Sequence, residues 1–210
     1  MNDETTGLKV GRVPTQARAR KRVETILHEA TGMIAAHGLD ALRMSELAQR
    51  AGIPIGSLYQ YFPDKAAVVA QLSMRLNDEG RRCVADELTP VRTEKELFAA
   101  IGEIADRFYA MYVEQPAMKA VWQATQASPV LQELDAKDGI EHSKLLSQAM
   151  TRVYPRADSH KLFALSALLM TQLAAAVRFA ITLDDGDARM VLDMFKSLML
   201  PRKIEALDRS

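Results

Sequence analysis

The sequence contains few of the residues that cross-link small domains or hold metal ions. Cys83 is the single cysteine among 210 residues, which excludes an intramolecular disulfide framework and any site built from several cysteines. One cysteine also fits a reducing cytosol, and we expect this thiol to be partly buried rather than a redox sensor. The four histidines and the acidic turn at residues 184–187 lack the spacing of zinc or calcium ligands.

Long hydrophobic runs and an overall excess of one charge are missing too. The 27 basic residues balance 27 acidic ones, so the chain as a whole has no bulk attraction to nucleic acid or membrane. The first 20 residues carry charges and no apolar stretch, so we expect no secretory signal and a cytoplasmic protein. The most apolar stretch, residues 162–183, still contains Ser166 and Arg178. We interpret it as a buried helix and not a membrane span.

Motifs of catalysis are likewise missing. The sequence has no nucleophile elbow, no phosphate-binding loop and no dinucleotide fingerprint. We therefore predict that the chain is not an enzyme and uses no metal or cofactor.

The sequence is instead rich in helical signals, and no segment alternates as a strand does. Val23, Ile26, Leu27, Ala30 and Ile34 recur at steps of three and four, which is one buried helical face. The pattern predicts an all-α fold of about nine helices, with an N-terminal three-helix domain and a C-terminal helical bundle. Helices are expected over residues 15–37, 45–51, 54–62, 64–88, 93–115, 116–127, 128–154, 158–183, and from 184 to an interruption at Pro201.

Two of the expected helices are short and are joined by a turn that contains Gly52. This spacing is typical of a helix-turn-helix motif, here residues 43–62, whose second helix enters the DNA major groove. At 100° per residue, Leu58 and Phe62 point inward while Gly56 and Gln60 point outward. The alternative is an ordinary helical hairpin with a solvated polar face.

The outward face has the chemistry to contact DNA. Gly56 permits close approach to a groove wall, Gln60 can pair with an adenine edge, and Ile55 can touch a thymine methyl group. The hydroxyls of Ser57 and Tyr59, with the ammonium group of Lys65, can bind phosphates.

This stretch resembles the tetracycline-repressor (TetR) family of bacterial transcriptional regulators. The resemblance covers about residues 17–65 and is carried by Gly38-Leu39-Asp40, Leu47-Ala48, Ala51-Gly52-Ile53 and the run from Gly56 to Lys65. It implies phosphate contacts at Tyr59 and Lys65 and base contacts at Ser45, Ile55, Gly56 and Gln60. Two residues depart from the family pattern: Arg43 stands where a threonine is usual and is expected to take over its phosphate contact, and Pro54 replaces a capping serine.

Positive charge is concentrated near the N-terminus. Residues 9–65 hold nine basic and five acidic residues, a net charge of +4, and this asymmetry suggests a polyanionic partner. A basic run at residues 18–22 stands at a helix start, where positive charge opposes the helix dipole. This run is either a solvated face or a surface that binds the phosphate backbone. In the second case a disordered basic arm at residues 1–14 is expected to bind DNA with it. The predicted DNA contacts are Arg18, Arg20, Arg22, Arg43, Ser45, Ile55, Gly56, Ser57, Tyr59, Gln60, Tyr61 and Lys65.

The last two helices carry more apolar surface than one core can bury. The resemblance implies that such helices pair in a homodimer, and two-fold dimers read two half-sites of a palindromic operator. The alternative is that both helices are simply core. The predicted interface residues are Leu165, Leu168, Leu169, Leu173, Ala176, Val191, Met194, Phe195 and Leu198.

The middle helices are rich in methionine and aromatic residues, a composition of either core or an adaptable ligand wall. The resemblance implies a small, largely apolar ligand there whose binding moves the helix at residues 64–88. The predicted ligand contacts are Phe108, Met111, Tyr112, Met118, Trp122, Gln123, Gln126, Met150, Met170 and Arg178.

Taken together, residues 15–65 are predicted to bind DNA and residues 66–210 to bind a ligand and dimerise. The chain is then a ligand-responsive transcriptional regulator, and more specifically a repressor. The alternative is a regulator of the same fold that is controlled by a protein partner instead of a small molecule.

Overall fold

The computed structural model describes residues 13–126 and 129–199, and every regular element within them is helical. The predicted all-α class is therefore confirmed, with nine α-helices in the described part of the chain. The chain forms two compact units, one ending at Val68 and the other beginning at Val69.

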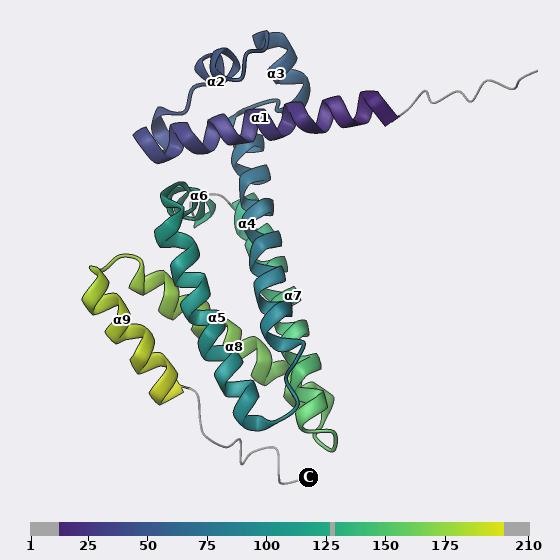
Figure 1. The fold of residues 1–210 in the computed structure, drawn as a ribbon, viewed down its shortest axis with the longest axis vertical. Coiled ribbons are helices and arrows are strands. Elements are labelled where there is room, and N and C mark those ends of the chain that lie inside the picture. Colours follow the sequence, from purple (N-terminus) through teal and green to yellow (C-terminus); the bar gives the residue numbers. More distant parts are fainter. Residues whose placement is uncertain (1–12, 127–128, 200–210) are drawn as a thin grey trace, which may run out of the picture. The chain divides into compact units, whose positions relative to one another are not determined.

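The first unit is built on a long helix and two short ones (Figure 1). The buried face of the long helix includes Ile26, Leu27, Ala30 and Ile34, as the periodicity predicts. This helix begins two residues before the expected start at Thr15, because a proline fits without penalty in the first turn of a helix. The elements are α1 (Val13–His37), a 3₁₀ turn η1 (Leu39–Ala41), α2 (Met44–Arg50) and α3 (Ile55–Tyr61).

Gly52 makes the turn between α2 and α3 possible. Its φ of +65° lies in the left-handed region, which a residue with a Cβ atom adopts only with strain. The turn is closed by the N–H of Ile53, which donates to the carbonyl oxygen of Ala48 at 3.0 Å. A side chain at position 52 would therefore disturb the angle at which α3 leaves α2.

Helix α5 of the second unit begins at the capping box that the sequence predicts, and the predicted cap of α7 at Ser128 lies outside the described residues. At the start of α5 the N–H of Glu96 donates to Thr93 Oγ1 at 3.3 Å, and the N–H of Thr93 donates to Glu96 Oε2 at 3.0 Å, which completes a capping box. The helices are α4 (Lys65–Leu88), α5 (Glu94–Glu114), α6 (Pro116–Gln126), α7 (Pro129–Val153), α8 (Ser159–Ala180) and α9 (Asp185–Met194), followed by a π-helical segment η2 (Phe195–Met199).

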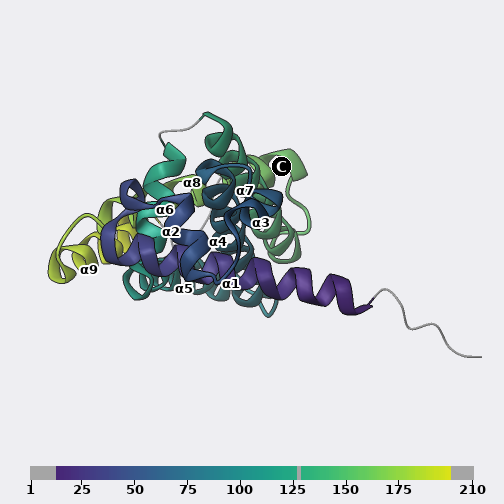
Figure 2. The same cartoon turned by 90° about the horizontal axis from the view of Figure 1, so that it is seen from above.

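The core of the second unit lies among α5, α7 and α8. Its largest fully buried side chains include Ile101 and Ile104 of α5, Leu146 and Met150 of α7, and Leu162 of α8. Helix α9 packs on α8 and lies at the edge of this unit in both views (Figures 1 and 2). The arrangement leaves one face of α9 uncovered within the chain.

Helix α8 is only partly the buried helix that the sequence predicts. By length and mean hydropathy it is the one helix in the described part of the chain that could cross a membrane, yet only 33% of its most apolar window is buried. Leu169, Leu173 and Val177 face the core, whereas Leu168 and Phe179 are exposed. One apolar face of α8 therefore has no cover from its own chain.

Candidate nucleic-acid interface and ligand pocket

The two faces of α3 are divided as the sequence predicts. Leu58 is fully buried and Phe62, directly after the helix, is 5% exposed. Gly56 and Gln60 are exposed on the other side, and Tyr59 has 49% of its surface exposed. Burial of the apolar face fixes the rotation of α3, and so it presents the small polar face outward.

The other predicted DNA contacts of the first unit are spread over α1, α2 and the start of α4. Arg18, Arg20, Arg22, Arg43, Ser45 and Ile55 are exposed, and Ser57, Tyr61 and Lys65 are half-buried. Residues 1–12, which include most of the proposed basic arm, lie outside the described residues.

Arg43 stands at the N-cap of α2 but does not cap it through its side chain. Its guanidinium instead donates to the carbonyl oxygen of Asp40 at 2.6 Å. The guanidinium is thus held beside the helix start, an orientation that suits a phosphate contact.

The second unit contains a cavity of about 480 Å³. Its volume falls in the range of sites for small organic ligands. Helices α4 to α8 all contribute to its wall. Six predicted ligand residues line it: Phe108, Met111, Tyr112, Trp122, Met170 and Arg178.

The other four predicted ligand residues do not line this cavity. Met118 is buried elsewhere, and Met150 lies in the core, where its sulfur accepts a hydrogen bond from the Ser166 hydroxyl at 3.2 Å. Gln123 is exposed, and the side chain of Gln126 lies outside the described residues. Composition alone could not separate these residues from the wall, because methionine serves core and pocket equally well.

Sequence reasoning missed a polar part of the wall on α7. Asp135, Asp138 and His142 all line the cavity. They are spaced three and four residues apart, and so they share one helical face. Leu131 and Leu146, both buried, continue that face in each direction. Titratable residues at buried positions of an apolar repeat were the signal that could have revealed this part of the site.

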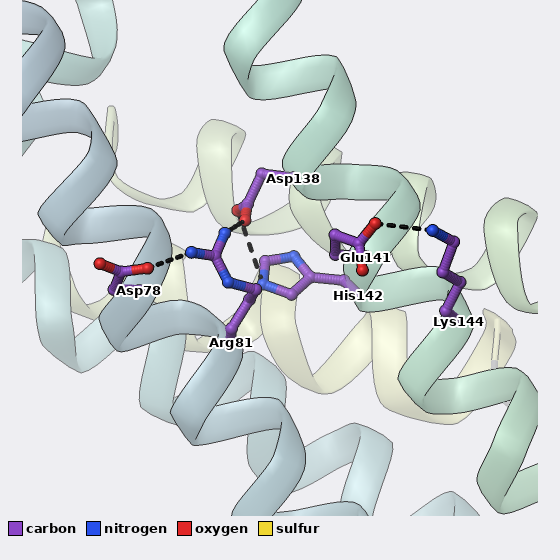
Figure 3. Close-up of polar contacts among 6 residues, drawn as sticks. All are labelled: Asp78, Arg81, Asp138, Glu141, His142 and Lys144. Carbon is purple, nitrogen blue, oxygen red and sulfur yellow. Dashed lines mark hydrogen bonds and ion pairs between the residues drawn. The ribbon is translucent and has the colours of Figure 1, made fainter.

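An ion pair joins this part of the wall to α4 (Figure 3). The Arg81 guanidinium donates to the carboxylates of both Asp78 and Asp138. Asp138 is only 8% exposed, and burial raises its pKa to about 6 although the charge of Arg81 opposes the shift. The pair therefore links a buried carboxylate of the pocket to the helix that follows α3 in the chain.

His142 lies beside this pair as a neutral base. Burial, followed by the charge of Arg81, lowers the pKa of His142 to about 4. Its Nε2 atom is 3.6 Å from Asp138 Oδ2 and has no hydrogen-bond partner among the described residues. Helix α4 packs closely on this imidazole, since a Cβ atom at Gly80 would lie in van der Waals contact, 3.4 Å from Nε2.

Arg178 and Tyr112 contribute polar groups from α8 and α5. The Cζ atom of Arg178 lies 5.7 Å from the centre of the Trp122 ring, a cation–π arrangement. Burial, followed by the charge of Asp135, raises the pKa of Tyr112 to about 12, so its hydroxyl is protonated at neutral pH. In the part of the chain that is described, no group of three or more histidine, cysteine, aspartate or glutamate residues is placed to hold a metal ion.

The predicted dimer residues fall into three groups. Leu168, Met194 and Leu198 are 53%, 54% and 74% exposed. Leu165, Ala176 and Val191 are half-buried. Leu169, Leu173 and Phe195 lie instead in the core of their own chain, at 4%, 0% and 5% exposed. The sequence does not separate Leu169 and Leu173 from an interface, because α8 is apolar nearly all round and its pattern does not reveal the inward face. Phe195, directly after α9, is buried in the same core.

Other apolar side chains of α8 and α9, which the sequence does not predict to lie in the dimer interface, are exposed to a similar extent. Phe179 and Met190 are 57% and 58% exposed. Large apolar residues gathered on uncovered helix faces indicate an interaction surface.

A helix-turn-helix unit followed by an all-helical unit with a ligand-sized cavity defines a class of protein, the DNA-binding transcriptional regulators with a regulatory domain. Comparison with protein families agrees. The family model "Tetracyclin repressor-like, C-terminal domain" matches residues 95–202, and the model "Bacterial regulatory proteins, tetR family" matches residues 26–72. The chain belongs to the TetR family, whose members are non-enzymatic DNA-binding transcription factors.

Solved structures with the same fold come from several bacteria. A TetR transcriptional regulator from Rhodococcus sp. RHA1 is 20% identical, with a TM-score of 0.61 over 87% of this chain and 97% of that one. A TetR-family regulator from Pectobacterium atrosepticum is 19% identical, with a TM-score of 0.66 over 88% and 95%. The regulator FadR from Bacillus subtilis, solved in complex with stearoyl-CoA, is 16% identical, with a TM-score of 0.60 over 83% and 97%. No curated protein matches the chain.

Proposed function

We propose that this regulator is a homodimeric repressor that binds a palindromic operator and leaves it when a small molecule occupies the cavity of the second unit. The observation that carries the proposal is the 480 Å³ cavity, lined mainly by apolar side chains, in the same chain as a helix-turn-helix with an exposed polar face. A regulator controlled by a protein partner would have no need of such a cavity. The protein would act in the cytoplasm, where the DNA is.

The proposed division of the chain assigns residues 1–14 to a basic arm, residues 15–65 to DNA binding and residues 66–210 to ligand binding and dimerisation. Ligand control is supported by the Arg81–Asp138 pair, because it joins the pocket wall on α7 to α4. A ligand that displaces α7 would then act on α4. FadR from Bacillus subtilis, solved with stearoyl-CoA, offers a precedent for a ligand on this fold.

The proposed homodimer is supported by the uncovered apolar faces of α8 and α9. Leu168 and Phe179 of α8, with Met190 and Met194 of α9, are each more than half exposed. Covering such side chains with a second copy stabilises the pair by roughly 25 cal/mol for each Å² of apolar surface removed from water. A two-fold dimer also presents two copies of α3 to two half-sites.

Two neighbouring residues on α3 are proposed to have different roles. Tyr59 positions the helix through a phosphate, whereas Gln60 reads a base edge. We therefore expect Tyr59→Phe to weaken binding to all operator variants about equally. Gln60→Ala should instead relax preference at one base pair, by about 1–3 kcal/mol. Binding titrations with a set of single-base operator variants separate the two patterns, and identical patterns for both substitutions would refute the assignment.

The proposed function is tested by the binding of purified protein to DNA from upstream of its own gene. Fluorescence anisotropy across a salt series, with random DNA as the control, gives both affinity and the number of phosphate contacts. We expect at least a thousandfold preference for the upstream DNA and a steep salt slope. Equal and weak binding to both DNAs would contradict an operator in that region.

A further inference from the structure

We infer that the cavity binds an amphipathic organic anion, an apolar body with a carboxylate head group that pairs with Arg178. This inference rests on the proposed function, since it names the chemical class of the ligand for the same pocket. It follows from the charges that the cavity contains and from those that are already neutralised within the chain.

Arg178 is held in a geometry that leaves its hydrogen-bonding edge available. The guanidinium lies over the face of Trp122, with Cζ 5.7 Å from the ring centre. A cation–π contact uses none of the guanidinium N–H groups to donate to an oxygen atom, and these planar N–H groups match the two oxygens of a carboxylate. No carboxylate in the described part of the chain forms an ion pair with Arg178. Its charge is therefore available to a ligand.

The acidic groups of the same wall are already engaged. Asp138 accepts from Arg81, which neutralises its charge within the wall. Asp135 also has an interaction of its own. His142 is neutral, because burial keeps its pKa at about 4. A cation that paired with Asp138 would have to displace Arg81 and lie near the like charge of Arg178, whereas an anion that pairs with Arg178 displaces no ion-pair partner.

Tyr112 adds a second donor near the same place. The charge of Arg178 acts on the pKa of Tyr112, so the two side chains lie within electrostatic range. Because the phenol remains protonated, it can donate a hydrogen bond to the oxygen of an anionic head group.

The rest of the wall fits an apolar body. Phe108, Met111, Phe163, Met170 and Val177 supply aromatic and aliphatic surface from α5 and α8. The attraction between Arg178 and a carboxylate is stronger in such surroundings than in water, because the local dielectric constant is lower. A purely apolar ligand would leave the Arg178 charge without a partner.

The test uses three probes with one ten-carbon body and different head groups: decanoate, decanol and decylammonium. Trp122 is the single tryptophan of the chain and lines the cavity, so its fluorescence reports occupancy directly. Isothermal titration calorimetry gives an independent affinity. We expect decanoate to bind at least tenfold more tightly than either of the other probes.

Substitution of Arg178 assigns that preference to the guanidinium. Arg178→Gln should remove the preference for decanoate, while decanol binds as it does to the wild type, which shows that the pocket is still folded. Arg178→Lys should keep part of the preference, because it keeps the charge but loses the planar pair of donors. Arg156→Gln, at an exposed arginine outside the pocket wall, is the matched control and should change nothing.

Three results would overturn the inference: decanol or decylammonium binding as tightly as decanoate, an undiminished preference in Arg178→Gln, or no binding of any probe. None of them would decide the proposed function, because operator binding by the ligand-free protein is measured separately. A preference for decylammonium, for example, would reverse the charge of the ligand and leave a ligand-controlled repressor intact.

Discussion

Replacing Leu168 with arginine should convert the proposed dimer into a monomer while each chain remains folded. Leu168 lies on the uncovered face of α8 with 53% of its surface exposed, so the free chain can accommodate a charge there. In a two-fold dimer the same charge would be introduced on both copies. A buried, unpaired charge in an interface costs several kcal/mol, and so dissociation should increase by a factor of a thousand or more. Light scattering coupled to size exclusion measures the mass.

The neighbouring residue provides the matched control. Leu169 is 4% exposed and lies in the core of its own chain, so Leu169→Arg should destabilise the chain itself, by about 3–5 kcal/mol. Urea unfolding should therefore separate the two variants, with Leu168→Arg close to the stability of an isolated wild-type chain. A dimeric Leu168→Arg protein would place the interface on another surface.

Loss of dimerisation should also reduce operator affinity. A monomer binds one half-site, and it lacks the higher affinity that comes from joining two DNA-binding domains in one molecule. We expect Leu168→Arg to bind the operator at least a hundredfold more weakly than the wild type. Its binding to a single half-site should be nearly unchanged, because α3 itself is not altered.

Removing the Asp138 carboxylate should make the protein more sensitive to acid. The pKa of Asp138 is raised to about 6 in the folded chain, so its contribution to stability is present below its usual pKa of 3.8 and is lost as the pH rises through 6. The pKa of His142 is lowered from 6.5 to about 4. Its contribution is present above pH 6.5 and is lost as the pH falls through 4. Between pH 4 and 6 the two groups therefore change the free energy of unfolding in opposite directions as the pH changes, and their effects nearly cancel.

Asp138→Asn removes the pH dependence that Asp138 contributes to the free energy of unfolding and leaves that of His142. Relative to the wild type, the free energy of unfolding of this variant should fall by about 1.4 kcal/mol for each pH unit between 6 and 4. His142→Gln should show the opposite change, and the double variant should return to the wild-type slope. Urea unfolding at a series of pH values measures the differences, and a curve for Asp138→Asn parallel to the wild type would contradict the paired titration.

The fold class and the face of α3 could be predicted because both depend on local pattern. Helix periodicity and caps are set by residues three or four positions apart. The turn at Gly52 depends on the conformational freedom of one residue. Thus Leu58 and Phe62 could be placed inside and Gln60 outside from the sequence. Helix ends were less well predicted: the helix expected over residues 158–183 ends at Ala180 as α8. The last helix changes to a π-helical segment after Met194 and continues to Met199, the last described residue.

Which apolar face of α8 is inward was decided only by the tertiary structure. Nearly every position of this helix is apolar, so the sequence does not distinguish Leu168 from Leu169. Packing on α5, α7 and α9 makes that distinction. The pocket is a similar case, because a cavity exists only where helices from distant parts of the chain leave space unfilled. That is why Met150 was predicted to line it and lies in the core, and why Asp138 and His142 were not predicted and line it. The sequence determines which residues of each helix are apolar enough to be buried. Which of them are buried depends on how all the helices pack together.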